Sequence, residues 1–383
     1  MKTDKNFAIN TLQKLVQINS VNPMLSSGAP GEKEICNYIA DVLKKLNLNP
    51  EIQNIAKNRY NVTATIKGVG NGKSLMLNAH TDTVGVENME DPFSGKISDG
   101  KLFGRGAYDM KGSIAAMLAA AKAIVDNKIE LEGDLVLAFV ADEEYDSIGT
   151  EHLLTTIKTD GAIITEPSNL DICIAHRGFG LYEVITKGKV AHGGRPDIGI
   201  DANMHMGKLL NELHKLSQDL KDKEPHPLLG KPSLHVPVIN GGTEPFTYSG
   251  ECKITLERRT IPGNKEKECL AEIKNIIEKL SAEDQSFKAE VKQIMWRDPF
   301  EANKESKLVK KLSDSSKLVL NKEPDYIGHT WWEDSALTDK AGIDTVVIGP
   351  KGEGLHTANE WIDLDSVNEL AEILYLTVID YCQ

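Results

Sequence analysis

The stretch Leu75–Asp82 reads Leu-Met-Leu-Asn-Ala-His-Thr-Asp, an apolar run that ends abruptly in two side chains able to bind a metal, His80 and Asp82. Side chains alternate along an extended strand, so the i, i+2 spacing points both in the same direction. A histidine that binds a metal usually has its second ring nitrogen held by a carboxylate or a carbonyl group. We therefore interpret this stretch as a buried strand that delivers a metal ligand together with a second ligand or an orienting partner.

The composition predicts a globular protein of two domains. The chain has 383 residues, and a single hydrophobic core usually supports a smaller domain than that. Its net charge of −13 argues against a nucleic-acid partner, because phosphate requires a surplus of positive charge. No apolar run approaches the roughly 18 residues of a membrane span, and the N-terminus lacks the apolar core of a signal peptide. Five scattered cysteines without a CxxC pair indicate reduced thiols, so we expect a cytoplasmic protein without a membrane partner.

Two further apolar strands end in acidic side chains. Residues 134–141 form a nearly continuous apolar run, as expected for a strand buried on both faces, and three acids follow at 142–144. A shorter run at 161–165 is followed by Glu166. Ligands of open α/β sheets bind beyond the carboxyl ends of strands, and buried acids are costly unless a cation meets them. The strand ends therefore predict a cation site, with an exposed turn as the alternative at 142–144.

Two glycine-rich loops deliver further metal-competent side chains. The segment DGKLFGRGAYD at 99–109 precedes an alanine-rich helix predicted over 111–126 and places Asp109 just before it. An aspartate in that position often caps a helix, so Asp109 is a cap, a metal ligand or both. Near the C-terminus, IGPKGEGLH at 348–356 follows an apolar strand and ends at His356.

The middle of the chain has a different pattern from its flanks. Helical periodicity at 200–220 and 265–280 alternates with strand patterns at 180–186, 234–239, 252–256 and 287–295. The order β-α-β-β-α-β is that of the ferredoxin-like split βαβ arrangement. We therefore predict an α/β catalytic domain with a mixed, largely parallel sheet, formed by residues 1–176 and 297–383, and an inserted ferredoxin-like lid domain at 177–296.

The predicted insert contains three polar residues of interest. His192 lies in a glycine-flanked turn, KVAHGGRP at 189–196, and Arg258 and Arg259 stand at the end of a strand. An exposed loop histidine is usually inert, and two arginines at a strand end are ordinarily surface charges. These residues alone therefore define no site.

Taken together and in order, the motifs resemble the family of co-catalytic zinc amidohydrolases. Its members include acetylornithine deacetylase, succinyl-diaminopimelate desuccinylase, aminoacylase and carboxypeptidase G. The resemblance covers essentially the whole chain and is highly specific, because so many motifs follow one another in the right order. These motifs are SVNP at 20–23, HTD at 80–82, GRGAYDMKG at 104–112, DEE at 142–144, EP at 166–167, HGGRP at 192–196, RTIPG at 259–263, and GP, His356 and Glu360 within 349–360.

The resemblance implies two Zn²⁺ ions per subunit, for which Co²⁺ or Mn²⁺ can substitute at nitrogen and oxygen donors. It implies that Asp82 orients His80 and that the Asp109–Met110 peptide is cis. The implied ligands are His80 and Glu166 on one metal, Glu144 and His356 on the other, and Asp109 between them.

The resemblance also implies hydrolysis of a linear amide. Glu143 is expected to be the general base that converts a water shared by the two metals into the attacking hydroxide, and to hand its proton to the departing amine. His192 is expected to reach the site of the partner subunit in a homodimer formed through the lid, and to stabilise the oxyanion. Arg259 is expected to hold a substrate carboxylate with its planar guanidinium, and Gly354 to contact the substrate with His192.

The first hypothesis for the activity is deacetylation of an N-acyl-L-amino acid of the acetylornithine type, which would place the protein in arginine biosynthesis. The alternative is a metallo-exopeptidase or desuccinylase acting on small peptides or N-succinyl amino acids. The third hypothesis is a catalytically silent binding protein. That hypothesis predicts a broken metal ligand or a missing base, whereas all five ligands and Glu143 are present here.

The segment GHTWWEDSAL at 328–337 leaves two roles open for Trp331 and Trp332. They form the wall of a pocket, or one is a core residue and the other a surface residue. Because Arg258 stands next to Arg259, it stays open which of the two arginines faces the substrate.

Overall fold

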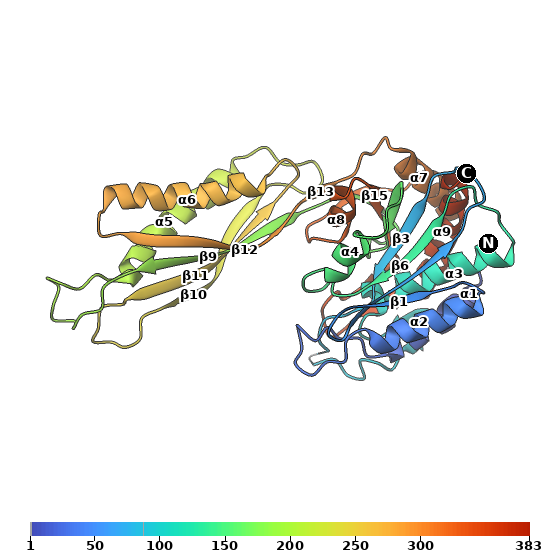
Figure 1. The fold of residues 1–383 in the computed structure, drawn as a ribbon, viewed down its shortest axis with the longest axis horizontal. Coiled ribbons are helices and arrows are strands. Elements are labelled where there is room, and N and C mark those ends of the chain that lie inside the picture. Colours follow the sequence, from blue (N-terminus) through green and yellow to red (C-terminus); the bar gives the residue numbers. More distant parts are fainter. Residues whose placement is uncertain (1, 87) are drawn as a thin grey trace. The chain divides into compact units, whose positions relative to one another are not determined.

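The computed structural model describes residues 2–86 and 88–383, which form two compact units (Figure 1). Unit 1 comprises Met1–Ile174, Ala302–Ile327 and Glu333–Gln383. Unit 2 comprises Ala175–Glu301 and Gly328–Trp332. The boundaries at 175 and 301 lie close to the predicted 177 and 296, and unit 2 takes in a short second segment that the sequence did not separate.

The larger sheet has nine strands. Parallel pairing joins its four central strands, and antiparallel pairing prevails at both edges. The predicted mixed sheet is therefore confirmed, but less of it is parallel than expected. One reason is that only two residues connect the first two strands, and so short a turn permits antiparallel pairing alone. The order is β1 (Glu51–Ala56), β2 (Arg59–Ile66), β6 (Leu135–Val140), β3 (Leu75–His80), β7 (Gly161–Ile164), β15 (Asp344–Val347), β8 (Ile172–His176) and β13 (Phe300–Glu301), with β14 (Tyr326–His329) beside β8.

Helices bury the central strands of this sheet. Every residue of β3 and β6 is buried, which explains why both strands are continuous apolar runs. Helix α3 (Gly112–Asp126) contacts α1 (Lys5–Gln17) and α9 (Leu364–Tyr381), and its many alanines allow this close packing. The remaining helices of unit 1 are α2 (Lys33–Lys45), α4 (Ile148–Leu153), α7 (Lys307–Leu320), α8 (Ser335–Lys340) and the short π-helix η1 (Ala107–Lys111).

A small second sheet in unit 1 brings the two glycine-rich loops together. Its strands run in the order β16 (Gly352–Glu353), β17 (Trp361–Asp363), β5 (Lys101–Phe103) and β4 (Lys96–Ser98). The antiparallel pairing of β5 with β17 holds the segment that leads to Asp109 beside the segment that follows His356. This sheet was not predicted from the sequence.

Unit 2 has the predicted ferredoxin-like arrangement. Its elements are β9 (Gly178–Lys187), α5 (Ala202–Lys221), β10 (Ser233–Gly241), β11 (Glu251–Thr260), α6 (Glu266–Glu283) and β12 (Lys288–Arg297). The four strands pair antiparallel in the order β10-β11-β9-β12. Burial alternates along β9 and β11, so one face of the sheet packs on the two helices and the other is partly open.

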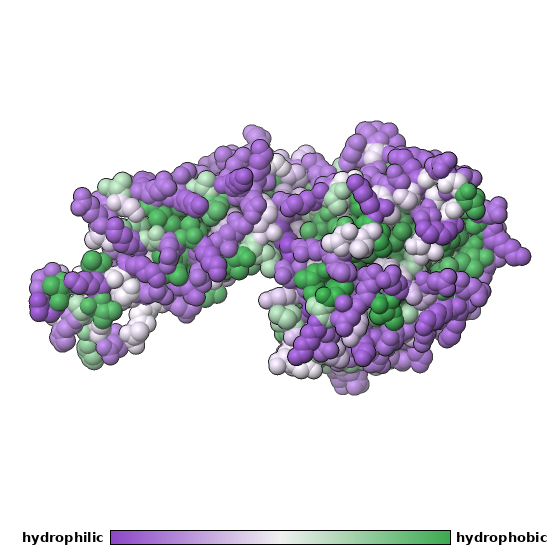
Figure 2. All heavy atoms as spheres, in the orientation of Figure 1, coloured by the Kyte–Doolittle hydropathy of each residue, from purple (hydrophilic) through white to green (hydrophobic). Residues whose placement is uncertain are grey.

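The face shown in Figure 2 is mostly hydrophilic, with apolar patches on both units. No described helix combines the length and the apolar character needed to cross a lipid bilayer. The exposed large apolar residues of unit 2 include Val190, Ile198, Met204, Val238, Ile239 and Phe246.

Candidate metal centre

Three neighbouring parallel strands of the larger sheet converge on one group of polar residues. The strand order β6-β3-β7 and the pairing of His80 with Val140 place the carboxyl ends of these strands side by side. His80 ends β3, the acids 142–144 follow β6, and Glu166 follows β7. The polar side chains after the strands therefore meet at the edge where ligands of α/β sheets bind.

Asp109 lies between two histidines. Its Oδ1 is 3.0 Å from Nε2 of His80, and its Oδ2 is 3.2 Å from Nε2 of His356. Nε2 of His80 is also 3.6 Å from Oε1 of Glu166, and Nε2 of His356 is 3.0 Å from Oε2 of Glu144. The five residues thus divide into two halves that share Asp109, which is the division implied by the sequence resemblance.

The backbone of Asp82, rather than its side chain, orients His80. Nδ1 of His80 lies 2.9 Å from the carbonyl oxygen of Asp82, whereas the Asp82 carboxylate is 3.7 Å away. That carboxylate instead accepts hydrogen bonds from the backbone N–H groups of Glu143 and Glu144, at 3.2 and 3.3 Å. With Nδ1 held by a carbonyl, Nε2 of His80 is the nitrogen available to a metal.

Asp109 does not cap the helix that follows its loop. Helix α3 begins at Gly112 with Lys111 in the N-cap position, and Asp109 has the non-helical angles φ −115° and ψ 92°. The predicted role of Asp109 as a helix cap is therefore wrong, and its role as a metal ligand stays a prediction. The Asp109–Met110 peptide is cis, as the resemblance implies.

Glu360, which follows the other glycine-rich segment, holds the loop that carries Asp109. Its Oε1 accepts hydrogen bonds from the N–H groups of Tyr108 and Asp109 at 2.9 and 3.0 Å, and its Oε2 accepts from the N–H of Gly106 at 2.9 Å. The Arg105 guanidinium donates to the same Oε2 at 2.6 Å. The sequence motif contained Glu360, but no role was predicted for it.

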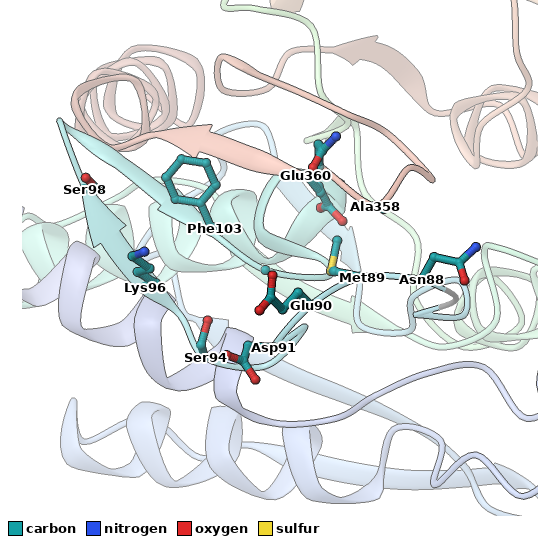
Figure 3. A pocket seen from close by; sticks show the side chains of 12 residues that line it. Asn88, Met89, Glu90, Asp91, Ser94, Lys96, Ser98, Phe103, Ala358 and Glu360 are labelled. Atoms are coloured by element: carbon teal, nitrogen blue, oxygen red, sulfur yellow. The ribbon is translucent and has the colours of Figure 1, made fainter.

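Glu360 also borders a hollow of about 620 Å³ (Figure 3). The wall of this hollow mixes charged, polar and apolar side chains, among them Glu90, Asp91, Lys96 and Phe103. The hollow was not predicted from the sequence, because distant segments within 88–104 and 358–360 form its wall together.

The centre holds a surplus of buried negative charge. Burial raises the pKa of Glu143 and Glu166 well above the usual value, and raises that of Glu144. Hydrogen bonds to Asp109 and Glu144 raise the pKa of His356 to about 10. A buried surplus of acidic side chains attracts a cation.

The donors fit divalent metal ions. Nitrogen and oxygen ligands suit Zn²⁺, Co²⁺ and Mn²⁺. Oε1 of Glu144 is buried and finds no hydrogen-bond partner among residues 2–86 and 88–383, so a cation would satisfy it. The ligand atoms of His80, Asp109 and Glu144 lie within 4.8 Å of one another, as do those of His80, Glu143 and Glu166.

His192 and Arg259, the two residues of the insert with a predicted role, lie in unit 2. His192 is exposed, and its Nδ1 accepts the N–H of Gly194 at 3.1 Å. Arg258 is 2% exposed and donates to Glu272, whereas Arg259 is 31% exposed and pairs with Glu257 at 2.8 Å. Of the two arginines, only Arg259 is accessible to a ligand.

Three further residues singled out in the sequence have structural contacts. Gly354 has φ 89°, and a Cβ there would meet the carbonyl oxygen of Asn359 at 2.4 Å, so the backbone requires glycine. Its role in substrate binding stays a prediction. Trp331 is exposed and stacks on His329, whereas Trp332 is half-buried and donates to the carbonyl of Asp298 at 3.1 Å.

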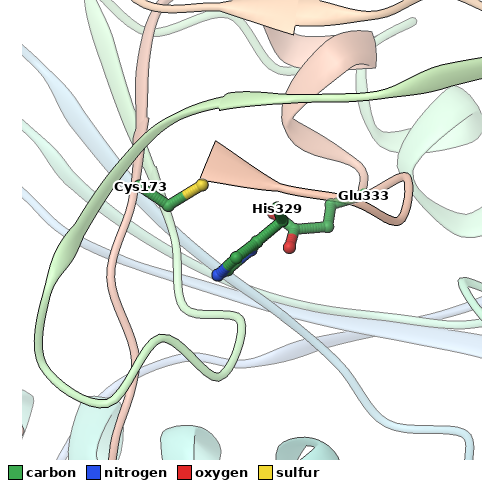
Figure 4. A group of neighbouring side chains, drawn as sticks. All are labelled: Cys173, His329 and Glu333. Atoms are coloured by element: carbon green, nitrogen blue, oxygen red, sulfur yellow. The ribbon is translucent and has the colours of Figure 1, made fainter. Parts of the chain in front are cut away.

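Three further buried side chains are of metal-ligating types, and none of them was predicted. Cys173 and Glu333 belong to unit 1, and His329 belongs to unit 2 (Figure 4). They are far apart in the sequence and show no ligand spacing, so the sequence carries no signal for them.

The fold and the centre define a metal-dependent hydrolase of amide bonds, and comparison with known proteins agrees. The model of peptidase family M20/M25/M40 matches residues 76–380. The chain therefore belongs to this family of metal-dependent amidohydrolases and peptidases, and the resemblance noted in the sequence is confirmed.

Two relatives and one solved structure illustrate the match. An uncharacterized metallohydrolase of Methanocaldococcus jannaschii is 28% identical, over 96% of this chain and 98% of its own. Acetylornithine deacetylase of Buchnera aphidicola is 26% identical, over 98% of both chains. The crystal structure of aminopeptidase PepT from Bacillus cereus superposes with a TM-score of 0.80 over 100% of both chains, and its 19% identity shows a common fold alone.

Proposed function

We propose that this enzyme removes the acyl group from an N-acyl-L-amino acid, using two Zn²⁺ ions and Glu143 as the general base. The observation that carries the proposal is the position of Asp109, with one carboxylate oxygen facing His80 and the other facing His356. A carboxylate shared in this way suits a pair of metals. Co²⁺ or Mn²⁺ would occupy the same donors.

The reaction adds water across the amide bond. Divalent cations held by His80, Glu166, Glu144, His356 and Asp109 would polarise the amide carbonyl and lower the pKa of the attacking water. Glu143 accepts a proton from that water and returns it to the amine nitrogen as the C–N bond breaks. The backbone N–H of Glu143 is held by the Asp82 carboxylate at 3.2 Å, which fixes the segment that carries the base.

Arg259 anchors the substrate by binding the substrate's carboxylate. Its guanidinium is accessible in unit 2 and lies 5.1 Å from the centre of the Phe179 ring, which limits its movement. The acetylornithine deacetylase of Buchnera aphidicola supports an acylated amino acid as substrate, and with it a role in arginine biosynthesis. The fold shared with an aminopeptidase keeps exopeptidase activity as the second candidate.

The proposed enzyme is a cytoplasmic homodimer formed through unit 2. All five cysteines are buried thiols, which suits a reducing compartment. His192 is exposed in a loop of unit 2 rather than packed in its core, so it is available to the partner subunit. There it would stabilise the oxyanion.

A substrate panel tests the activity. The Zn²⁺-loaded protein is assayed on N-acetyl, N-succinyl and N-formyl amino acids and on dipeptides. We expect the acetyl amino acids to give the highest kcat/KM. Faster hydrolysis of dipeptides or succinyl compounds would replace the proposal by the corresponding alternative.

Substitution of the base tests the mechanism. Glu143→Ala should abolish turnover while the protein still binds two metal ions, because Glu143 is proposed as base and not as ligand. Glu130→Ala, an exposed acid of the same unit, is the control and should be fully active. Full activity of Glu143→Ala would disprove the assignment, and loss of metal would mean that Glu143 and Glu144 have exchanged roles.

A further inference from the structure

A buried polar network in unit 1 lies directly behind the segment that carries Glu143 and Glu144. Its members come from distant parts of the sequence: the turn after α1, the residue before α2, the start of β2, and the residues after β3 and β6. All are at most 4% exposed, although four of the five side chains are charged. They are Asn22, Glu32, Arg59, Asp82 and Asp142.

Asp82 connects this network to the metal centre. Its Oδ1 accepts the N–H of Glu143 at 3.2 Å, and its Oδ2 accepts the N–H of Glu144 at 3.3 Å. The same Oδ2 accepts a hydrogen bond of 2.8 Å from Nδ2 of Asn22. Asn22 therefore fixes the carboxylate that holds the backbone of the proposed base and of a proposed ligand.

Asn22 also reaches a second carboxylate. Its Nδ2 donates to Oδ1 of Asp142 at 2.9 Å, so one amide nitrogen joins Asp82 and Asp142. Asp142 has φ 72°, a left-handed conformation at which the chain leaves β6 and turns toward Glu143. A non-glycine residue keeps this conformation only where its surroundings hold it.

Arg59 supplies a positive charge that partly offsets these acids. Its Nη1 donates to Oδ1 of Asp142 at 2.5 Å, and its Nη2 and Nε donate to Oε1 of Glu32 at 2.6 and 2.9 Å. Arg59 is the only cation among the five side chains, against three carboxylates. Its removal would leave buried like charges adjacent to one another, which repel and rearrange.

We propose that Asn22 and Arg59 are positioning residues, which set the geometry of Glu143 and Glu144 by acting through Asp82 and Asp142. Neither is placed to touch a metal or substrate. The inference rests on the proposed function insofar as Glu143 is the base and Glu144 a metal ligand. It gives a role to the asparagine of the SVNP motif, for which none was assigned.

The experiment separates positioning from stability. Asn22→Ala and Arg59→Met are compared with Lys67→Met, which removes an exposed ion pair to Asp134 just after the same strand β2. Each variant is titrated with Zn²⁺ against a chromophoric chelator, its Co²⁺-loaded form is examined by visible absorption, and kcat and KM are measured. Thermal unfolding reports stability.

We expect Asn22→Ala and Arg59→Met to bind Zn²⁺ about 10- to 100-fold more weakly or to lose a similar factor in kcat with little change in KM, as is usual when a group that orients metal ligands is removed. The Co²⁺ spectrum should change as well, because it reports ligand geometry. Lys67→Met should match the wild type in every measurement.

A double variant guards against a folding defect. Arg59→Met with Glu32→Gln removes one positive and one negative charge together, so it keeps the charge balance of the network while the link to Asp142 is lost. Folded variants with wild-type Zn²⁺ affinity, Co²⁺ spectrum and kcat would overturn the inference. A wild-type protein that binds fewer than two Zn²⁺ ions would instead refute the proposed metal centre itself.

Discussion

Glu360 holds the backbone around Asp109, the proposed bridging ligand, from a distant part of the sequence. One buried carboxylate accepts from three backbone N–H groups at 106, 108 and 109 and from the Arg105 guanidinium. The loop is rich in glycine and has little intrinsic stiffness. The position of Asp109 between His80 and His356 therefore depends on the charge and the two acceptor atoms of Glu360.

Replacing Glu360 tests this dependence. Glu360→Gln removes the negative charge and one of the two acceptor oxygens, so we expect kcat and Zn²⁺ affinity to fall about 10- to 100-fold. Activity assays and competitive Zn²⁺ titration measure both. Glu353→Gln, an exposed acid in the same segment, is the control and should behave as the wild type. Unchanged Zn²⁺ affinity in Glu360→Gln would show that the loop holds its shape without this carboxylate.

Asp82 shows where residue-level prediction reached its limit. The i, i+2 rule correctly placed His80 and Asp82 together, but strand β3 ends at His80. Beyond that residue the alternation of a strand no longer applies. The Asp82 carbonyl therefore turns to the imidazole, while the carboxylate bonds to Glu143 and Glu144.

At the scale of elements, long apolar strands were predictable and short ones were not. Strands β3 and β6 have continuous apolar sequences that burial on both faces requires. Strands β5 and β17 have three residues each, Lys-Leu-Phe and Trp-Ile-Asp, too few for any periodicity. Their pairing brings the loops of Asp109 and His356 together, so the proximity of these residues could be inferred only from the family resemblance.

Helix α3 is an element whose sequence dictates its packing. Nearly all its residues are buried, alanine recurs along it, and the helix contacts α1 and α9. Small side chains permit such close approach, and larger ones have no room.

A substitution in α3 measures this tight packing. Ala119 is 0% exposed, so Ala119→Leu should destabilise the protein by about 1–3 kcal/mol through overpacking. The urea concentration at the midpoint of unfolding reports the change. Asp126→Leu at the exposed last residue of the helix, which loses only a surface ion pair with Lys122, should cost less than about 1 kcal/mol. Equal stability of Ala119→Leu and wild type would mean that α3 has free space around it.

At the scale of the whole molecule, unit 2 presents two edge strands of unequal character. Strand β10 is exposed along most of its length, and Val238 and Ile239 are 46% and 54% exposed. Strand β12 alternates between exposed and half-buried residues, with Ile294 as its exposed large apolar residue. An uncovered, apolar edge strand is a template for pairing with another chain. The proposed homodimer should therefore form through β10.

A matched pair of charge substitutions tests that interface. Ile239→Lys places a charge on β10 and should convert the dimer to a monomer in sedimentation velocity, because an isologous interface receives the charge twice. Ile294→Lys places the same charge on the opposite edge and should remain dimeric.

Mixing the His192→Ala protein with the Glu143→Ala protein should restore part of the activity. One site of such a mixed dimer contains Glu143 from one chain and His192 from the other. Adding Ile239→Lys to both chains should prevent that recovery. A monomeric wild type, or no recovery in well-exchanged mixtures, would mean that each chain forms a complete site.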